Sequence, residues 1–552
     1  MYDIDHVPLS SQHPHIFMKL TNATTLADTL PSTSMSTAIV NLVVTILSIL
    51  GVLKLYRKAA NRKANKNLSP LPPGPAPWPI VGNLPELLRC KPTFRWVHGF
   101  MKEMNTDIAC IRVRNTHFIP VLSPEIAREI CRKQDTIFST RPLTLGTREI
   151  SGGFLTPLFA PYNEQWKKMR KMLISEVVSP ARIKWLHDKR AKEGDNLVFY
   201  VQNQYMANKS VNLRLVTRHY CGNVSRRMFL GRRNFGRGMP DGGPGPEEIE
   251  HVEAIFNFMK YVDTFCISDY FPFLAGLDLD GQQRWMKHIN NVIGKYHNPI
   301  IDERIRQWRS GRKDMDDILD VLITLKDPTG SPFLSEDEIR HQLVEFMIAS
   351  VDNPSNAIEW AMAEMINQPE LMKKAHEEID RVVGKERLVQ ESDIEKLNYV
   401  KACAREAYRL HPLSPFNVPH MSMEDTTVAG YYIPKGSHAL LSRYGLGRNP
   451  KVWANPLKFD PERHMNQGDV SLLENDLRFI SFSTGRRGCI AGILGTYMTI
   501  MLLARLVQCF DWTPPPIGID LSEAVDELLT PATPVSAFAM PRLPHHLYPT
   551  QN

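Results

Sequence analysis

The sequence predicts a mainly α-helical domain with a small β-sheet subdomain, preceded by one N-terminal transmembrane helix. Three features lead to this prediction: an uncharged apolar stretch near the N-terminus, long segments with helix-capping residues, and only a few short β-rich stretches. The chain has 552 residues, of which 43% are hydrophobic and 23% are charged. This composition is typical of a globular protein, and the length permits a large core without disulfide or metal cross-links.

The transmembrane helix is predicted because no charged residue occurs between Thr29 and Leu53, and Ala38–Leu53 consists mostly of Ile, Val and Leu. A helix of this length spans about 24 Å, which suits the thin endoplasmic reticulum membrane. Basic residues follow the apolar run between Lys54 and Lys66, so the positive-inside rule places the remaining chain in the cytosol. A cleaved signal peptide, the first alternative, would carry its basic residues before the apolar run. A buried core helix is the second alternative.

The domain organisation follows from this single-pass arrangement. We expect a luminal segment over residues 1–34, the membrane anchor over 35–56, and a polybasic, proline-rich linker over 57–82. The luminal segment contains the glycosylation sequon Asn22-Ala23-Thr24. One domain is expected over residues 83–552, because neither a second proline-rich linker nor an internal repeat follows.

Charge and cysteine content narrow the possible functions. The net charge of +7 arises largely from the basic stretch at 54–66, and the rest of the chain is nearly neutral, so nucleic acid is not an expected partner. The eight cysteines include no CxxC pair, which favours a reducing compartment over a disulfide framework. We expect seven of them to be small core residues. The eighth, Cys489, has a different context.

Capping residues and β-rich stretches define the expected elements. Ser335 and Glu338 form a capping box ahead of a helix that ends near Asn367, with Pro354 inside it producing a local opening or kink. A second helix is expected over 393–410, and short strands over 108–114, 118–122 and 427–433. The glycine- and proline-rich stretch 238–246 is expected to be a surface loop, because it lacks the Gly-Lys-Ser/Thr of a phosphate loop.

Residues 482–492 carry the clearest chemical signal. Glycines flank Cys489, two arginines precede it, and an all-round apolar helix is expected over 490–510. Backbone N–H groups and a helix N-terminus stabilise a thiolate, the form of cysteine that binds metals. A thiolate held in this way is suited to axial ligation of haem iron.

This segment resembles the haem-thiolate signature FxxGxRxCxG of the cytochrome P-450 superfamily, with Ala491 in place of the last glycine. Three further segments are similar to superfamily motifs: ExxR at Glu406–Arg409, PERF at 461–464 with His464 in place of phenylalanine, and WxxxR at 166–170. The four motifs occur in the superfamily's order and the resemblance covers the chain after the anchor. It implies the cytochrome P-450 fold, haem b as cofactor, and electrons from NADPH through a flavoprotein reductase.

The resemblance also implies roles for individual residues. Cys489 would be the axial iron ligand, and the structural triad would consist of Glu406, Arg409 and Arg463. The residues expected to hold the haem propionates are Trp166, Arg170, His420 and Arg487. Four basic residues are expected on the side of the haem where a reductase docks, or as an ordinary solvated face: Lys167, Lys168, Lys171 and Arg486.

The long helix separates subclasses of the superfamily. Most monooxygenases carry (A/G)Gx(D/E)T(T/S) there, whereas this chain has Asp352 followed by Asn353 and Pro354. We expect Asp352 and Asn353 to be the catalytic positions. Loss of the threonine is compatible with the superfamily's reductase-independent dehydratases and isomerases, or with another group taking over proton delivery.

The string 352–356 is similar to that of plant amino-acid N-hydroxylases, as are 417–420, 461–464 and 483–491. In that family Ala491, His464 and Asn353 are the normal residues. The implied reaction is two successive N-hydroxylations of an L-amino acid, followed by dehydration and decarboxylation to an aldoxime.

Resemblance over the whole chain favours valine or isoleucine as substrate, in cyanogenic glucoside or defence aldoxime biosynthesis, with phenylalanine or tyrosine as the alternative. The pocket is expected to include Ala349, Phe416 and Asn417, from segments 148–158, 347–356 and 413–418. The expected partners are an NADPH-cytochrome reductase, the amino-acid substrate and the endoplasmic reticulum membrane. A haem-thiolate dehydratase or isomerase and a non-catalytic haem sensor are the remaining hypotheses.

Overall fold

A computed structural model describes residues 69–262, 265–474 and 476–550, together with five residues between 44 and 52. The chain divides into two units, residues 1–68 and 69–552. The predicted sequon at Asn22, the basic stretch and most of the predicted membrane helix lie outside the described residues. The five described residues of that helix are helical, and all five side chains are exposed.

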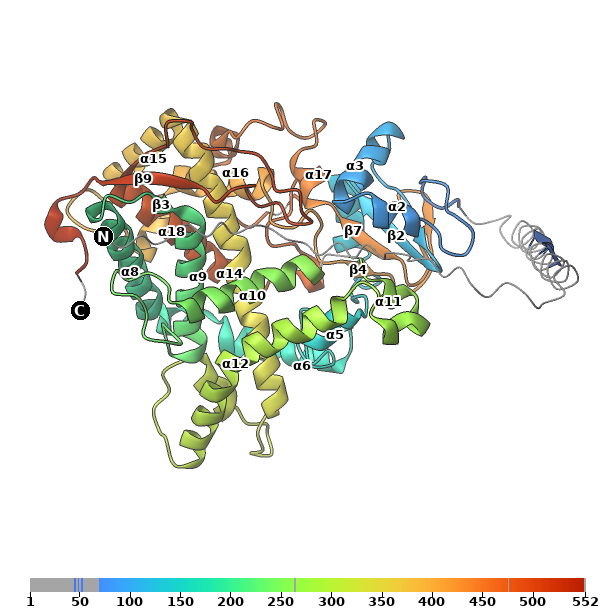
Figure 1. Ribbon diagram of the computed structural model, residues 1–552, viewed down its shortest axis with the longest axis horizontal. Coiled ribbons are helices and arrows are strands. Elements are labelled where there is room, and N and C mark those ends of the chain that lie inside the picture. Colours follow the sequence, from blue (N-terminus) through green and yellow to red (C-terminus); the bar gives the residue numbers. More distant parts are fainter. Residues whose placement is uncertain are drawn as a thin grey trace, which may run out of the picture. The chain divides into compact units, whose positions relative to one another are not determined.

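The second unit is mostly helical, with α14 running through the middle of the helices (Figure 1). Its α-helices are α2 Leu84–Arg89, α3 Thr93–Glu103, α4 Pro124–Arg128, α5 Leu145–Ile150, α6 Glu164–Met172, α7 Pro180–Trp185, α8 His187–Met206, α9 Leu213–Leu230, α10 Pro246–Val262, α11 Ile267–Tyr270, α12 Gln282–Arg309, α13 Ile318–Thr324, α14 Glu336–Asn367, α15 Pro369–Val382, α16 Asn398–Leu410, α17 Arg443–Gly447 and α18 Gly492–Cys509. The stretch 238–246 forms the loop before α10, as predicted.

Three small sheets accompany the helices. The strands are β1 Ile111–Val113, β2 Thr116–Val121, β3 Val211–Asn212, β4 His420–Met421, β5 Thr426–Val428, β6 Tyr431–Ile433, β7 His438–Leu441, β8 Phe510–Thr513 and β9 Ser536–Pro541. The largest sheet has the order β1-β2-β7-β4, with β2 and β7 parallel and Phe118 opposite His438. With α2 and α3 it lies to one side of the helices, at the right of Figure 1. The mainly helical fold with a small sheet subdomain is therefore confirmed for the described residues.

Helix α14 confirms the predicted capping box and end. The Ser335 hydroxyl accepts from the Glu338 N–H, and the Glu338 carboxylate accepts from the Ser335 N–H. The helix continues through Pro354 to Asn367, so the proline removes one backbone donor without ending the helix. From Val351 to Ile366 every residue except Asn353 is buried. This stretch of the helix is therefore part of the core, and Asn353 is its one accessible position.

Two predicted elements need correction. The helix expected over 393–410 is split into a 3-10 turn, Glu391–Lys396, and α16. The split occurs because the Glu378 carboxylate of α15 caps the start of α16, where it accepts from the Tyr399 and Val400 N–H groups. The strand expected over 427–433 is the hairpin β5–β6. Its turn residues Ala429 and Gly430 both have positive φ, as a tight two-residue hairpin requires.

The apolar helix predicted after Cys489 is α18. It is the one described helix long and apolar enough to cross a membrane, but 78% of it is buried within the protein. It packs against α8, α15 and α16, so it is a core helix of this domain.

The C-terminal part of the chain reaches back to α14. Strand β9 pairs with β3 and β8, and the loop before it lies against the long helix. The Leu529 carbonyl accepts from Trp360 Nε1 at 2.9 Å and from Asn356 Nδ2 at 3.4 Å. The last segment of the chain therefore helps to fix the middle of α14.

Candidate functional site

The loop around Cys489 is held by its own backbone. The Cys489 N–H donates to the Phe482 carbonyl at 2.8 Å, and the Gly488 N–H donates to the Gly485 carbonyl at 3.0 Å. Gly485 has a φ of +72°, and a Cβ there would lie 2.5 Å from the Cys131 carbonyl oxygen. Only glycine fits this position, and α18 begins three residues after the cysteine.

The Cys489 thiol lines an internal space. Its side chain is accessible, whereas Cys131, Cys221, Cys266, Cys403 and Cys509 are buried. The surrounding protein nevertheless raises the pKa of the thiol by burial, while the Ala491 N–H and the Arg170 charge act in the opposite direction. An accessible sulfur enclosed by protein indicates room for a ligand beside it. Cys90 and Cys110 are half-buried, so the prediction of seven core cysteines is wrong for these two.

Three guanidinium groups gather near this loop. We call Arg141, Arg170 and Arg487, with Trp166 and His420, the open cluster. Arg170 and Arg487 lie over the Trp166 ring at 5.4 and 4.8 Å from its centre. Arg170 donates to the Gly488 carbonyl, which adjoins the cysteine, at 3.2 Å. Burial, and then repulsion from Arg141 and Arg170, lowers the pKa of Arg487 to about 8.

Arg487 retains hydrogen-bonding capacity. Its three nitrogens donate to the carbonyls of Ser139, Pro157 and Ala160. A guanidinium carries five N–H groups, so two remain for another acceptor.

The open cluster also contains Arg141, which the sequence analysis did not identify. Arg141 donates to the Val418 and Pro419 carbonyls, and its Nε is buried without a partner. His420 donates through Nδ1 to the Phe138 carbonyl at 2.9 Å, and its Nε2 is also buried without a partner. A usable sequence signal was that no acid occurs between Asp135 and Glu149, a stretch that contains Arg141.

These residues fit a haem. The two acids that approach the open cluster do not neutralise it: Asp135 pairs with Arg486, and burial raises the pKa of Glu345 to about 7. Buried bases without matching acids require an anionic ligand, and the two propionates of haem b are carboxylates that bind guanidinium groups well. Cys489 lies beside this cluster because Arg170 contacts Gly488.

A second charged group, the closed network, lies around Glu406. Arg409 donates to both carboxylate oxygens at 2.7 and 2.8 Å, Arg463 donates to Oε1 at 2.9 Å, and His464 Nε2 lies 2.8 Å from Oε2. Burial raises the pKa of Glu406, but the bonds from Arg409 and His464 outweigh it and hold the pKa at about 2. Arg409 also donates to the carbonyls of Gly447, Pro456 and Lys458.

The candidate catalytic residues of α14 face different surroundings. Asp352 is fully buried and neither carboxylate oxygen has a hydrogen-bond partner. Burial raises its pKa well above the ordinary value, and Arg218 of α9 offsets this only partly. Asn353 is half-buried and accepts from Arg443. Ala349, one turn earlier, is exposed, so Ala349 and Asn353 lie on the accessible face of the helix.

The other candidate residues are placed as follows. Phe416 stacks on His98, with ring centres 5.6 Å apart. Asn417 Nδ2 donates to the Ser483 hydroxyl at 3.4 Å, which connects the 413–418 segment to the cysteine loop. Three of the four expected docking residues form ion pairs within the protein: Lys167 with Glu164, Lys168 with Glu338, and Arg486 with Asp135.

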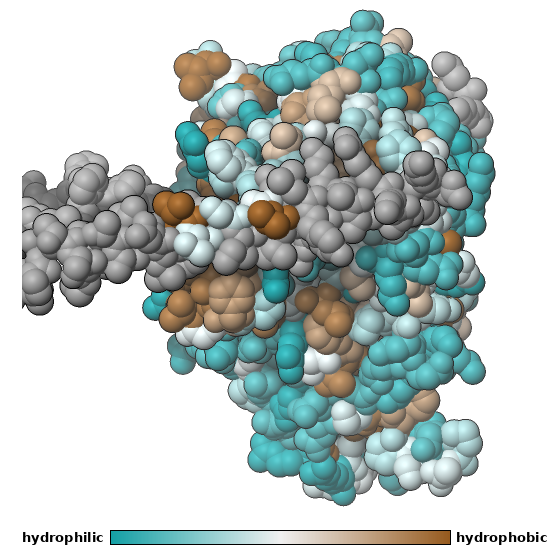
Figure 2. All heavy atoms as spheres, turned by 90° about the vertical axis from the view of Figure 1, so that its right-hand side faces the viewer, coloured by the Kyte–Doolittle hydropathy of each residue, from teal (hydrophilic) through white to brown (hydrophobic). Residues whose placement is uncertain are grey.

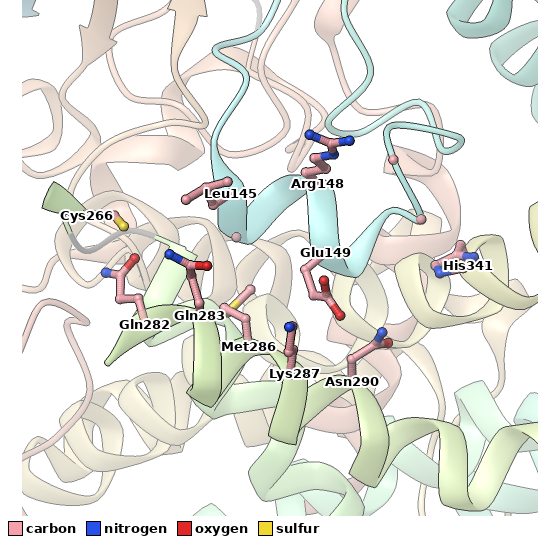
Figure 3. A pocket seen from close by; sticks show the side chains of 13 residues that line it. Leu145, Arg148, Glu149, Cys266, Gln282, Gln283, Met286, Lys287, Asn290 and His341 are labelled. Carbon is pink, nitrogen blue, oxygen red and sulfur yellow. The ribbon is translucent and has the colours of Figure 1, made fainter. Parts of the chain in front are cut away.

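A separate cavity of about 580 Å³ lies between α5, α12 and the start of α14. Figure 3 shows Glu149 of α5 and Lys287 of α12 pointing into the space between the two helices. Its lining is largely polar and includes Arg148, Gly152 and Gly153 of the expected pocket segment 148–158. The lining does not include Cys489, Ala349 or Asn353, so this cavity is distinct from the space beside the sulfur.

Comparison with known proteins identifies the family. The cytochrome P-450 family model matches residues 72–536. The chain is 63% identical to valine N-monooxygenase 1 of Manihot esculenta, over 96% of this chain and 98% of that relative. It is 53% identical to tyrosine N-monooxygenase of Sorghum bicolor over 96% and 98%, and 54% identical to phenylalanine N-monooxygenase of Arabidopsis thaliana over 90% and 97%. The chain therefore belongs to the cytochrome P-450 family: it is an oxidoreductase with a haem-iron cofactor, a small-molecule substrate and electrons supplied by a reductase.

Proposed function

We propose that this protein N-hydroxylates an L-amino acid twice to give an aldoxime, and that the amino acid is valine or isoleucine. The observation that carries the proposal is the 63% identity, over nearly the whole of both chains, to a valine N-monooxygenase. The tyrosine and phenylalanine N-monooxygenases are about ten percentage points less similar. Phenylalanine or tyrosine is the second candidate substrate. The product would feed cyanogenic glucoside or defence aldoxime biosynthesis.

The proposed haem contacts follow from the geometry of the site. Cys489 would supply the thiolate that holds the iron, and the open cluster would hold the propionates through Arg141, Arg170, Trp166, His420 and Arg487. The closed network of Glu406, Arg409, Arg463 and His464 is structural, because its carboxylate and guanidinium groups find their hydrogen-bond partners within the fold. When bound, the haem supplies oxygen activation, which no side chain of this protein can provide.

The protein's own residues position the substrate and the proton. Asp352 is buried without a hydrogen-bond partner, and burial raises its pKa well above the ordinary value, so the protein favours the protonated form, which can supply a proton from within α14. Asn353 and Ala349 lie on the accessible face of the same helix, where they contact the substrate. We assign Phe416 and Asn417 to the opposite wall, because Asn417 is tied to Ser483 of the cysteine loop. An apolar pocket favours the neutral amine, which has the lone pair that N-hydroxylation needs.

We also propose that the protein is anchored in the endoplasmic reticulum membrane by residues 35–56, with its catalytic domain in the cytosol. Apolar side chains on the surface of the domain support this placement: Ile80 is 70% and Phe273 is 73% exposed. Val81 and Leu274, close to them in sequence, pack in one small cluster, so the exposed residues emerge from the same region. Figure 2 shows apolar patches on this side of the domain. A lipid surface is a partner suited to exposed aromatic and aliphatic residues.

Reductase docking is proposed for the face that carries α6 and the cysteine loop. Lys167, Lys168 and Arg486 are already paired with acids of this chain, whereas Lys171 is exposed and has no ion pair among the described residues. Docking of an acidic reductase here should weaken as salt screens the charges.

The reaction is tested with microsomes that contain the protein and a reductase. Isotope-labelled valine, isoleucine, phenylalanine and tyrosine are supplied together, with and without NADPH. Aldoxime formed only with NADPH, chiefly from valine and isoleucine, supports the proposal. Aldoxime chiefly from an aromatic amino acid supports the second candidate substrate. Turnover of an aldoxime or hydroperoxide without NADPH contradicts the reaction and favours a reductase-independent dehydratase or isomerase. No turnover with a full haem content favours a haem sensor.

A further inference from the structure

Arg443 connects the long helix to the segment that leads into the cysteine loop. It begins α17 and is buried. Its Nε donates to the Ile480 carbonyl at 3.0 Å, and its NH1 donates to Asn353 Oδ1 at 3.3 Å. Ile480 lies two residues before Phe482, whose carbonyl accepts from the Cys489 N–H. One side chain therefore spans the distance between the cysteine loop and the candidate catalytic position of α14.

The contact determines which way the Asn353 amide faces. Arginine has only donors, so the atom of the amide that meets Arg443 must be the oxygen. The amide nitrogen is on the other branch of the same planar group, and it therefore points away from Arg443. Asn353 is the single accessible residue between Val351 and Ile366, and Ala349, one turn earlier, is exposed, so we infer that the nitrogen is directed toward this accessible face of the helix.

We propose that Arg443 is a positioning residue that fixes the Asn353 amide with its oxygen held and its two N–H donors directed into the site. Asn353 then presents its N–H donors to an oxygen atom held between α14 and the sulfur. A freely rotating amide, by contrast, would present its donor and its acceptor equally. The role in the reaction rests on the proposed function. The orientation itself does not, because it depends only on the contact between Arg443 and Asn353.

Three variants separate this role from simple structural support. Asn353→Asp keeps an oxygen toward Arg443 and replaces the N–H donors with an acceptor. Arg443→Met keeps similar bulk without a donor, so the amide is free to turn. Arg443→Lys keeps a donor and should restore part of the orientation. Arg448→Met is the control, because Arg448 follows α17 directly and donates to the Leu410 carbonyl and to Glu523, and no described contact joins it to Asn353.

The first measurement is the C–O stretching frequency of carbon monoxide bound to the reduced full-length protein. A donor near the bound gas lowers this frequency, so Asn353→Asp and Arg443→Met should both raise it, Arg443→Lys should raise it less, and Arg448→Met should leave it unchanged. The second measurement is aldoxime formed per NADPH consumed. It should fall on the order of ten-fold in Asn353→Asp, which loses the donors, and less in Arg443→Met, which keeps them without fixing their direction.

Two results would overturn the proposal. One is a C–O stretching frequency in Arg443→Met, with a full haem content, equal to that of the unaltered protein. The other is a frequency shift in Arg448→Met as large as that in Arg443→Met. If Arg443→Met fails to fold, Arg443→Lys and Asn353→Asp decide. A raised frequency in Asn353→Asp with a smaller rise in Arg443→Lys supports the proposal, and an unshifted frequency in either variant overturns it. Failure of the amino-acid reaction in the unaltered protein would contradict the proposed function without changing these frequencies.

Discussion

The closed network and the open cluster are both groups of buried and half-buried arginines, but they differ in the acceptors that these arginines meet. In the closed network the Glu406 carboxylate accepts from Arg409 and Arg463, and further arginine donors meet backbone carbonyls. In the open cluster the hydrogen bonds described for the arginines go to carbonyls, and burial, together with repulsion from the other two arginines, lowers the pKa of Arg487 to about 8. The first group is complete within the chain. The second becomes complete only with an anionic ligand, so the same residue type stabilises the fold in one place and binds the cofactor in the other.

Breaking the closed network should have the largest effect, on the stability of the folded protein. Glu406→Gln leaves Arg409 and Arg463 buried without their counter-charge, and removal of one partner from such a group costs about 3–5 kcal/mol. We expect little folded protein, measured by yield and by chemical unfolding of what remains. Because the folded pKa of Glu406 is depressed to about 2, its stabilising contribution is present above pH 4.5 and is lost as the pH falls toward 2. Folded protein of normal stability in Glu406→Gln would show that the network is dispensable.

Replacement of the proposed iron ligand should have the next largest effect, on the carbonyl spectrum of the reduced protein. Cys489→Ser replaces the sulfur beside the open cluster by a hydroxyl, which is not a thiolate donor. The reduced protein should lose the carbonyl absorption band that is typical of thiolate ligation, whereas its unfolding temperature without haem should stay close to that of the unaltered protein. An unchanged carbonyl spectrum would refute the ligand assignment.

Removing one base from the open cluster should weaken cofactor binding more than folding. Arg170→Gln loses a cation whose described hydrogen bonds go only to the Gly488 carbonyl. We expect haem to bind roughly ten-fold more weakly, in line with the loss of one charge-assisted hydrogen bond. Titration of the haem-free protein with haem measures the affinity. If Arg170→Gln bound haem as tightly as the unaltered protein but was less stable without haem, Arg170 would stabilise the fold and not bind the cofactor.

Asp352 is the reverse case, a buried acid without a hydrogen-bond partner, and its replacement should have the smallest effect on the protein. Its folded pKa is raised, so above the ordinary value of 3.8 the unfolded chain releases a proton that the folded chain retains. Stability should therefore fall as pH rises, by at most about 1.4 kcal/mol per pH unit. Asp352→Asn should be less sensitive to pH between 5 and 8 when unfolding is followed with urea. The same pH dependence in both proteins would mean that Asp352 is ionised in the folded state.

The sequence predicted the parts of the site that local motifs define. The capping box at Ser335 and Glu338, the apolar helix α18 and the glycine-bounded turn at Cys489 depend on neighbouring residues, so their structure follows from local chemistry. The family motifs also identified Glu406 and Arg409, whose three-residue spacing places them on one face of α16.

Contacts between distant segments could not be predicted in this way. The start of α16 is set by Glu378 of another helix, which sequence spacing does not reveal. Arg141 and Arg443 act through backbone carbonyls and an amide that are distant in sequence, and no motif marks such acceptors. The turn of the β5–β6 hairpin was missed because Ala429 adopts a positive φ that its residue type does not favour.

The bond between Leu529 and α14 has a consequence for the biosynthesis of the protein. The carbonyl that accepts from Asn356 and Trp360 belongs to a residue that follows them by 173 and 169 positions. During translation α14 is therefore synthesised long before this acceptor exists. The middle of the helix obtains these two contacts only late in synthesis, after the segments between α14 and Leu529 have been added.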